Sequence, residues 1–151
     1  MQLSKHLSLA EVTRSDTAKR KGVSNMPTPE HLENFKLLAE KVFEPIREHF
    51  KVPIHISSGY RSKELNKAIG GSSSSQHLLG QAIDIDMDGT PNGVTNKMVF
   101  DFIKNNLSFD QLINEFDYSW VHVSYNSNGK QRKQVLNAVK VGGKTTYTVH
   151  K

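Results

Sequence analysis

The longest regular pattern of apolar positions lies in the first third of the chain. Thr28 is a typical N-cap, and Pro29 follows it at the first helical position, where its missing N–H would have no partner. The apolar residues that follow recur three and four positions apart, and they are Leu32, Phe35, Leu38, Ala39, Val42, Phe43, Ile46 and Phe50. This spacing predicts one long amphipathic helix that ends near residue 49 and serves as a scaffold.

Shorter segments on both sides of this helix carry their own signals. Ser8 has Glu11 three residues later, a capping-box pattern that predicts a short helix, and a second short turn is expected over residues 15–21. Ser62 can cap a helix through Ala68, and Thr95 can cap another that runs to about residue 106. The glycine- and serine-rich residues 70–75 are expected to form a loop. The segments expected to be strands are 53–57, 82–87, 111–115, 119–125, 134–140 and 145–150.

The order of these elements predicts the fold class. Helices occupy about residues 1–50 and strands dominate about residues 52–150, an arrangement typical of α+β proteins. A chain of 151 residues can form one domain with a real core, but is short for two. We therefore expect a single α+β domain over residues 1–151, with an antiparallel sheet that has helices packed on one side.

Two of the expected strands place polar side chains on a common face. In residues 82–87 and 120–125, aliphatic residues alternate with polar ones, so each strand has one apolar and one polar face. If both strands bury the apolar face, Asp84 and His122 emerge on the same open side of the sheet. His77 precedes the first of these strands in a loop and can fold over that side.

The three residues have the chemistry of a catalytic zinc site. Such sites use three protein ligands and leave a fourth position open for water, whereas structural sites close with four ligands, often thiolates. His77, Asp84 and His122 offer two imidazoles and one carboxylate, and the chain has no cysteine. If these side chains converge, we expect zinc-dependent chemistry on a bound water.

A calcium loop shares some of these residues. Asp84, Asp86, Asp88 and Gly89 match the first half of an EF-hand loop, but its twelfth position is Thr95, where a bidentate Glu is required. The preceding residues also form an expected strand where an EF-hand has a helix. An EF-hand is therefore not expected, and an accessory Ca²⁺ site at Asp86 and Asp88 stays open.

Charge and hydropathy limit the partners. The formal net charge is +5, which favours anionic partners such as nucleic acid, an acidic membrane or a cell wall. No basic stripe interleaved with aromatic residues is present, so we do not expect nucleic-acid binding. No run approaches the roughly 20 apolar residues of a membrane span. The first residues lack the apolar region of a secretory signal, so we expect a protein made in the cytoplasm without a signal peptide. We also expect it to be a monomer.

Several motifs together resemble the M15 family of zinc peptidases. They are Ser58-Gly-Tyr-Arg-Ser62, Asn66, Gly70-Gly71-Ser72, the block Ser75-x-His77-x-x-Gly80-x-Ala82-x-Asp84, and Trp120-Val-His122. The resemblance extends from about Leu7 to Tyr147. It implies the fold shared by D-Ala-D-Ala peptidases and the hedgehog domain, and cleavage of the peptide stem of peptidoglycan by D-Ala-D-Ala carboxypeptidase or L-Ala-D-Glu endopeptidase activity. The small size without a signal is similar to phage endolysins, which act at the cell wall once released.

The resemblance also implies roles for individual residues. It makes His77, Asp84 and His122 the zinc ligands and Arg61 the group that stabilises substrate or transition-state charge, although a structural ion pair is the alternative for Arg61. The implied contacts with the peptide come from Ser75, Tyr60 and Trp120. Ser75 can instead hydrogen-bond its own loop, and the two aromatic residues can instead pack in the core.

The general base is the least determined part of the predicted site. Related enzymes place it shortly before the last His ligand, and here Glu115 lies seven residues and Asp117 five residues before His122. We prefer Glu115, because its longer side chain can reach a zinc-bound water from an adjacent strand. Two other functions stay open: a zinc-bearing binding module without catalysis, and a virion-associated or structural protein that engages the cell wall.

Overall fold

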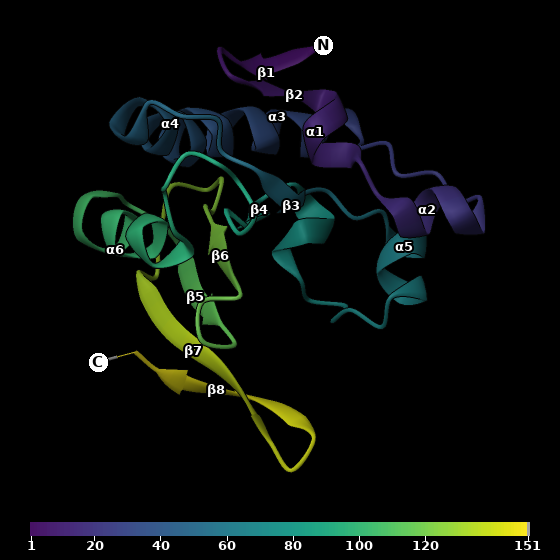
Figure 1. Ribbon diagram of the computed structural model, residues 1–151. Helices are drawn as coiled ribbons and strands as arrows, with labels where there is room; N and C mark the ends of the chain where they lie inside the picture. Colours follow the sequence, from purple (N-terminus) through teal and green to yellow (C-terminus); the bar gives the residue numbers. More distant parts are fainter. Residues whose placement is uncertain (151) are drawn as a thin grey trace.

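The computed structural model describes residues 1–150, and within them six strands form the main sheet (Figure 1). The spatial order is β3-β4-β6-β5-β7-β8. The strands are β3 (Ile56–Ser58), β4 (Ala82–Ile85), β5 (Gln111–Glu115), β6 (Trp120–Ser124), β7 (Gln134–Val141) and β8 (Lys144–Val149). All six predicted strands are present, although β3 begins three residues later than expected and β4 ends two residues earlier.

One strand pair departs from the expected antiparallel sheet. β5 and β7 run parallel, whereas the other neighbours in the sheet are antiparallel. Residues 125–133 carry the chain from the end of β6 across the start of β5, so β7 joins the far side of β5 in the same direction. Asp110 holds this crossing, because its buried carboxylate accepts hydrogen bonds from the backbone N–H of Arg132 at 2.9 Å and from its guanidinium at 2.8 Å.

The predicted long helix is present but contains a wider turn. It consists of α3 (Pro29–Leu38), a π-helical segment η1 (Ala39–Phe43) and α4 (Glu44–Phe50). Pro45 explains the interruption, because it has no N–H to donate and its ring clashes with the carbonyl of the preceding turn. The chain instead makes an i→i+5 hydrogen bond from the Glu44 N–H to the Ala39 carbonyl.

Side-chain caps begin four of the predicted helices. Ser8, Thr28, Ser62 and Thr95 each accept a hydrogen bond from a backbone N–H of the first turn, as expected. The remaining helices are α1 (Leu9–Thr13), α2 (Asp16–Lys21), α5 (Lys63–Ala68) and α6 (Asn96–Asn106). Two elements were not expected: a pairing of β1 (Gln2–Ser4) with β2 (Leu7–Ser8), and a 3₁₀ helix η2 (Gln76–Leu79) within the predicted loop region.

The main core lies between the helices and one face of the sheet. Apolar residues of α3, η1, α4 and α6 pack with one face of β4, β5 and β6, and the fully buried ones include Phe35, Leu38, Val42, Ile46, Ile83, Ile85, Phe100, Ile103, Leu112, Val121 and Val123. Figure 1 shows the β7–β8 hairpin at the opposite end of the molecule from α3 and α4. The α+β class is confirmed, although the sheet is mixed. The helices leave the second face of the sheet uncovered. Within residues 1–150, no helix combines the length and apolar character needed to cross a bilayer.

Candidate metal centre

Asp84 and His122 project from adjacent strands onto the face of the sheet away from the main core. They are paired residues of β4 and β6, and the aliphatic residues on either side of each belong to the buried core. Nδ1 of His122 lies 3.0 Å from Oδ1 of Asp84. The predicted common face of these two side chains is therefore confirmed.

His77 reaches the same point from η2. Ser75 caps this 3₁₀ helix, since its hydroxyl accepts a hydrogen bond from the His77 N–H, and Gly80 ends it with a left-handed φ of 71°. Nε2 of His77 lies 3.3 Å from Oδ1 of Asp84. The other ring nitrogen, Nδ1, lies 2.6 Å from the carbonyl oxygen of Gly59 and donates its proton to it. That hydrogen bond leaves the Nε2 lone pair free for a metal.

The three side chains form a donor set that fits zinc. One ligand atom from each of His77, Asp84 and His122 can be chosen so that all lie within 4.8 Å of one another, and the three residues are at most 9 % exposed. Burial alone would raise the pKa of Asp84, but the neighbouring imidazoles of His77 and His122 outweigh it and hold that pKa well below its usual range. The carboxylate is therefore ionised, as a metal ligand must be. Two imidazoles and one carboxylate are the ligands of catalytic zinc sites.

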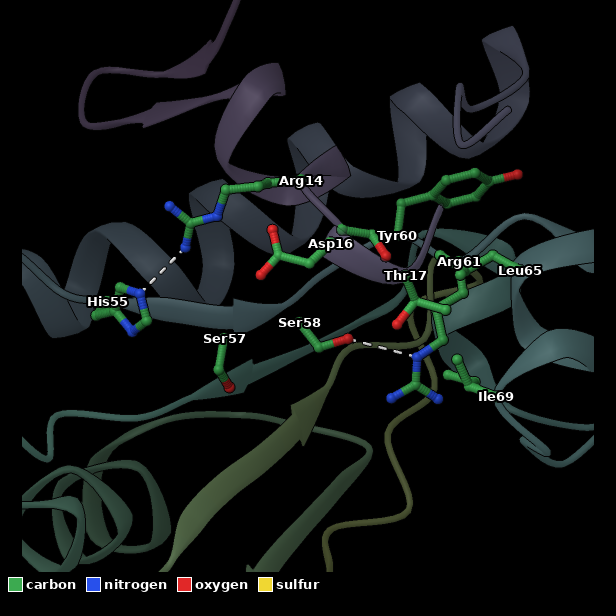
Figure 2. Close-up of a pocket in the computed structure, with 11 residues that line it drawn as sticks. Arg14, Asp16, Thr17, His55, Ser57, Ser58, Tyr60, Arg61, Leu65 and Ile69 are labelled. Atoms are coloured by element: carbon green, nitrogen blue, oxygen red, sulfur yellow. Dashed lines mark hydrogen bonds between the residues drawn. The ribbon is translucent and has the colours of Figure 1, made fainter. Parts of the chain in front are cut away.

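Arg61 lies at the edge of this group. Its Nη2 is 3.6 Å from Oδ2 of Asp84, and its Nε donates to the Ser58 hydroxyl at 3.4 Å, as Figure 2 shows. The Arg61 backbone N–H also donates to the His77 carbonyl at 3.2 Å, which ties the two loops together. The long ion pair and single side-chain hydrogen bond leave guanidinium donors available for a further anionic or polar group.

Glu115 lies one strand further along the same face. In β5, Glu115 is paired with Trp120 of β6. Ile113, two residues earlier in β5, is paired with His122 of β6. The Glu115 side chain is buried, and burial raises its pKa to about 7. His122 and Arg61 oppose this shift, whereas the negative charge of Asp84 adds to it. A carboxyl group with this pKa can both accept and release a proton near neutral pH.

Asp117, the alternative base, is held in the β5–β6 turn. Phe116, Asp117 and Tyr118 all have left-handed backbone conformations, with φ of 52°, 55° and 61°. Asp117 is exposed at the tip of this turn and is not among the described residues that line the cavity over the metal ligands. The structure therefore brings Glu115, and not Asp117, to the ligand group.

A cavity of about 680 Å³ lies over the ligands. Arg61 lines it, and so do Ser75 and Trp120, two of the three residues expected to contact a peptide. Tyr60 does not, because its ring is buried beside Phe35 and its hydroxyl lies 3.1 Å from Nδ1 of His31. Figure 2 shows the Tyr60 ring pointing away from Arg61, and Tyr60 packs in the main core while also lining a neighbouring hollow. This hollow of about 540 Å³ meets the main cavity at Arg61.

The cavity also has a wall that the sequence did not reveal. Leu136 of β7 and Thr145 and Tyr147 of β8 line it together with the ligands. The alternation within β7 and β8 indicates which residues share a face. The placement of this hairpin beside β5, however, depends on a parallel pairing for which the sequence carries no local signal.

Asp86 and Asp88 give no support to the accessory Ca²⁺ site. The Asp86 carboxylate accepts hydrogen bonds from the Asp88 N–H at 3.0 Å and from the Asn96 side chain at 3.1 Å, so it organises the turn after β4. Calcium needs six to eight oxygen ligands. Within residues 1–150, the cluster of His, Asp and Glu side chains suited to a metal is that of His77, Asp84 and His122.

Comparison with protein families gives an independent result. The family model described as Peptidase M15 matches residues 5–124. This range contains the three ligands, Arg61 and Glu115, and it ends before β7 and β8 begin. No curated protein matches the chain.

Proposed function

Because the chain belongs to the M15 family of metallopeptidases, we propose that it is a zinc-dependent enzyme that hydrolyses the peptide stem of peptidoglycan. The bond would be either D-Ala-D-Ala, by a carboxypeptidase, or L-Ala-D-Glu, by an endopeptidase. The observation that carries this proposal is the position of Glu115, a buried carboxyl that lines the same cavity as the group of His77, Asp84 and His122.

The proposed roles follow from the positions of the side chains. His77, Asp84 and His122 would hold zinc, which when bound lowers the pKa of water and polarises a carbonyl group. Glu115 would accept the proton of the attacking water and pass it to the leaving amine, which requires a pKa near the working pH. Arg61 would offset negative charge that develops on the peptide oxygen, or bind a terminal carboxylate.

The surroundings of the site support a peptide substrate. Ser75 and Trp120 line the same cavity and would contact the peptide. The net charge of +5 favours approach to an anionic cell wall, where we propose that the protein acts as a monomer, as a phage lysin does after release. Glu115 supports catalysis over a binding module that only carries zinc, because such a module has no need of a proton acceptor in the cavity.

The test is hydrolysis of purified peptidoglycan by zinc-loaded protein, with mass spectrometry of the released fragments. Release of D-Ala would identify a carboxypeptidase, and separation of L-Ala from D-Glu an endopeptidase. Glu115→Gln keeps the shape of the side chain but removes the proton acceptor, so we expect kcat to fall about 10²- to 10⁴-fold with unchanged zinc content.

Asp117→Asn is the matched control, because it removes a carboxylate from the turn that follows β5. We expect its kcat to stay within about twofold of wild type, since surface changes away from the reacting groups have small effects. Full activity of Glu115→Gln together with a large loss in Asp117→Asn would contradict the assignment of the base. No cleavage by zinc-loaded wild type would favour a binding module.

A further inference from the structure

The strand register connects Glu115 to the hairpin at the end of the chain. Glu115 of β5 is paired with Ala138 of β7, and Ala138 is paired with Tyr147 of β8. Paired residues of neighbouring strands project from the same face of a sheet. Trp120, Glu115, Ala138 and Tyr147 therefore form one row across four strands, on the face that carries the metal ligands.

The small residue in this row leaves space for the tyrosine. Neighbouring strands lie about 4.8 Å apart, so the Cα atoms of Glu115 and Tyr147 are separated by about 10 Å. Ala138 between them is fully buried and offers only a methyl group. The Tyr147 ring can thus lie over Ala138 on the side of Glu115, and Tyr147 lines the same cavity as the ligands.

The chemical state of Tyr147 suits a hydrogen-bond donor. Tyr147 is 54 % exposed. Partial burial raises the pKa of Tyr147, and the carboxylates of Glu115 and Asp84 raise it further. The phenol is therefore protonated at neutral pH.

An apolar floor lies between the metal ligands and Tyr147. Ile113 and Leu136 line the cavity, and with the fully buried Ala138 they form a cluster separate from the main core, against which Phe116 packs. Ile113 is paired with both His122 and Leu136, so this floor begins directly beside a ligand. Such a surface accepts a small aliphatic side chain, whereas a charged one would lose its hydration there.

We propose that the β7–β8 hairpin is the substrate-binding wall of the cleft. The floor would take an aliphatic side chain of the peptide next to the scissile bond, and the Tyr147 hydroxyl would donate a hydrogen bond to the peptide backbone. This inference rests on the proposed peptidase function. The hairpin lies outside the residues matched by the family model, so membership alone does not imply this role.

The single tryptophan of the chain makes binding measurable without cleavage. Trp120 lines the cavity, so its fluorescence should change when a peptide enters. The probe is the pentapeptide L-Ala-D-Glu-L-Lys-D-Ala-D-Ala, titrated into zinc-loaded protein in the Glu115→Gln background. The same peptide is used for steady-state kinetics in the background that retains Glu115.

The variants are Tyr147→Phe, Tyr147→Ala and the control Thr148→Ala. Removing one neutral hydrogen bond should raise both Kd and KM about threefold to tenfold in Tyr147→Phe, with a smaller change in kcat. Tyr147→Ala should weaken binding further. Thr148 projects from the opposite face, so its variant should bind as wild type does. Zinc content and the melting temperature Tm should be unchanged in all three.

The outcomes separate this inference from the proposed function. Unchanged Kd and KM in both Tyr147 variants would overturn the inference, even if wild type cleaves the peptide. If wild type does not cleave but Tyr147→Phe weakens binding, the wall is supported and the peptidase function is contradicted. Equal losses in Tyr147→Phe and Thr148→Ala would indicate a general disturbance of the hairpin and would also overturn the inference.

Discussion

Replacing Gly59 by alanine tests how the proposed ligand His77 is held. A Cβ at this position would lie 2.5 Å from the carbonyl oxygen and 2.7 Å from the Cα of Val12, both backbone atoms of α1. Ordinary contacts begin near 3.5 Å, so the two segments must separate by about 1 Å. The hydrogen bond from the Tyr60 N–H to the Val12 carbonyl joins these same segments and would be strained or lost.

Two effects are expected, one on the free energy of unfolding and one on zinc affinity. Overpacking costs about 1–3 kcal/mol and a backbone hydrogen bond about 1 kcal/mol, so the free energy of unfolding should fall by about 2–4 kcal/mol. The Gly59 carbonyl, which accepts the His77 Nδ1 proton at 2.6 Å, would move with its segment. Loss of such an outer contact weakens metal binding about 10- to 100-fold.

The assays are urea denaturation of the metal-free protein and zinc affinity by competition with a chelator. Gly129→Ala is the control, because its φ of 86° is unfavourable for alanine but a Cβ there meets nothing within 4 Å. It should lose about 1 kcal/mol of stability and keep its zinc affinity. Zinc binding by Gly59→Ala as tight as in wild type would refute the role of the Gly59 carbonyl. Unchanged stability would refute the close packing against α1.

Two further predictions concern a titration and a buried amide. In the metal-free protein the pKa of Glu115 is raised from 4.5 to about 7, so its contribution to stability is present below its unfolded pKa and is lost as pH rises through its folded pKa. Between pH 5 and 7.5, urea denaturation should show wild type losing on the order of 2 kcal/mol more than Glu115→Gln, and parallel profiles would contradict this. Asn96→Ala removes a buried amide that accepts from the Met87 N–H and donates to the Tyr118 and Ser119 carbonyls. It should lower the free energy of unfolding by about 3 kcal/mol, and a loss below about 1 kcal/mol in urea denaturation would count against these contacts.

The sequence predicted those parts of the site that depend on local pattern. Alternation within β4 and β6 was enough to place Asp84 and His122 on one face, because a residue's side of a strand follows from its neighbours along the chain. The helix starts were equally local, since Ser62 and Thr95 cap the turns that directly follow them. A residue whose position depends on distant contacts gave no such signal. Tyr60 is one, because its burial depends on packing against α3.

The turn after β5 shows why the choice between the two acids stayed open. Three successive residues there adopt left-handed conformations, and none of them is a glycine or an asparagine. Only Asp117 is of a type enriched in this conformation, and one such residue does not predict three in a row. Residues on either side of the turn hold it: the Tyr118 N–H donates to the Asn114 side chain, and the Ser119 hydroxyl donates to the Phe116 carbonyl.

The position of Glu115 itself depends on the register of β5, which its own sequence leaves ambiguous. Residues 112–115 read Leu-Ile-Asn-Glu, two apolar residues followed by two polar ones, so neither face is marked as the buried one. A slip by one residue would turn Glu115 toward the helices. The observed register is fixed because Leu112 enters the main core while Ile113 is covered by Leu136 and Ala138 on the other face. The hairpin that lines the substrate side of the cavity therefore also orients the proposed general base, and changes in its apolar floor should affect both binding and proton transfer.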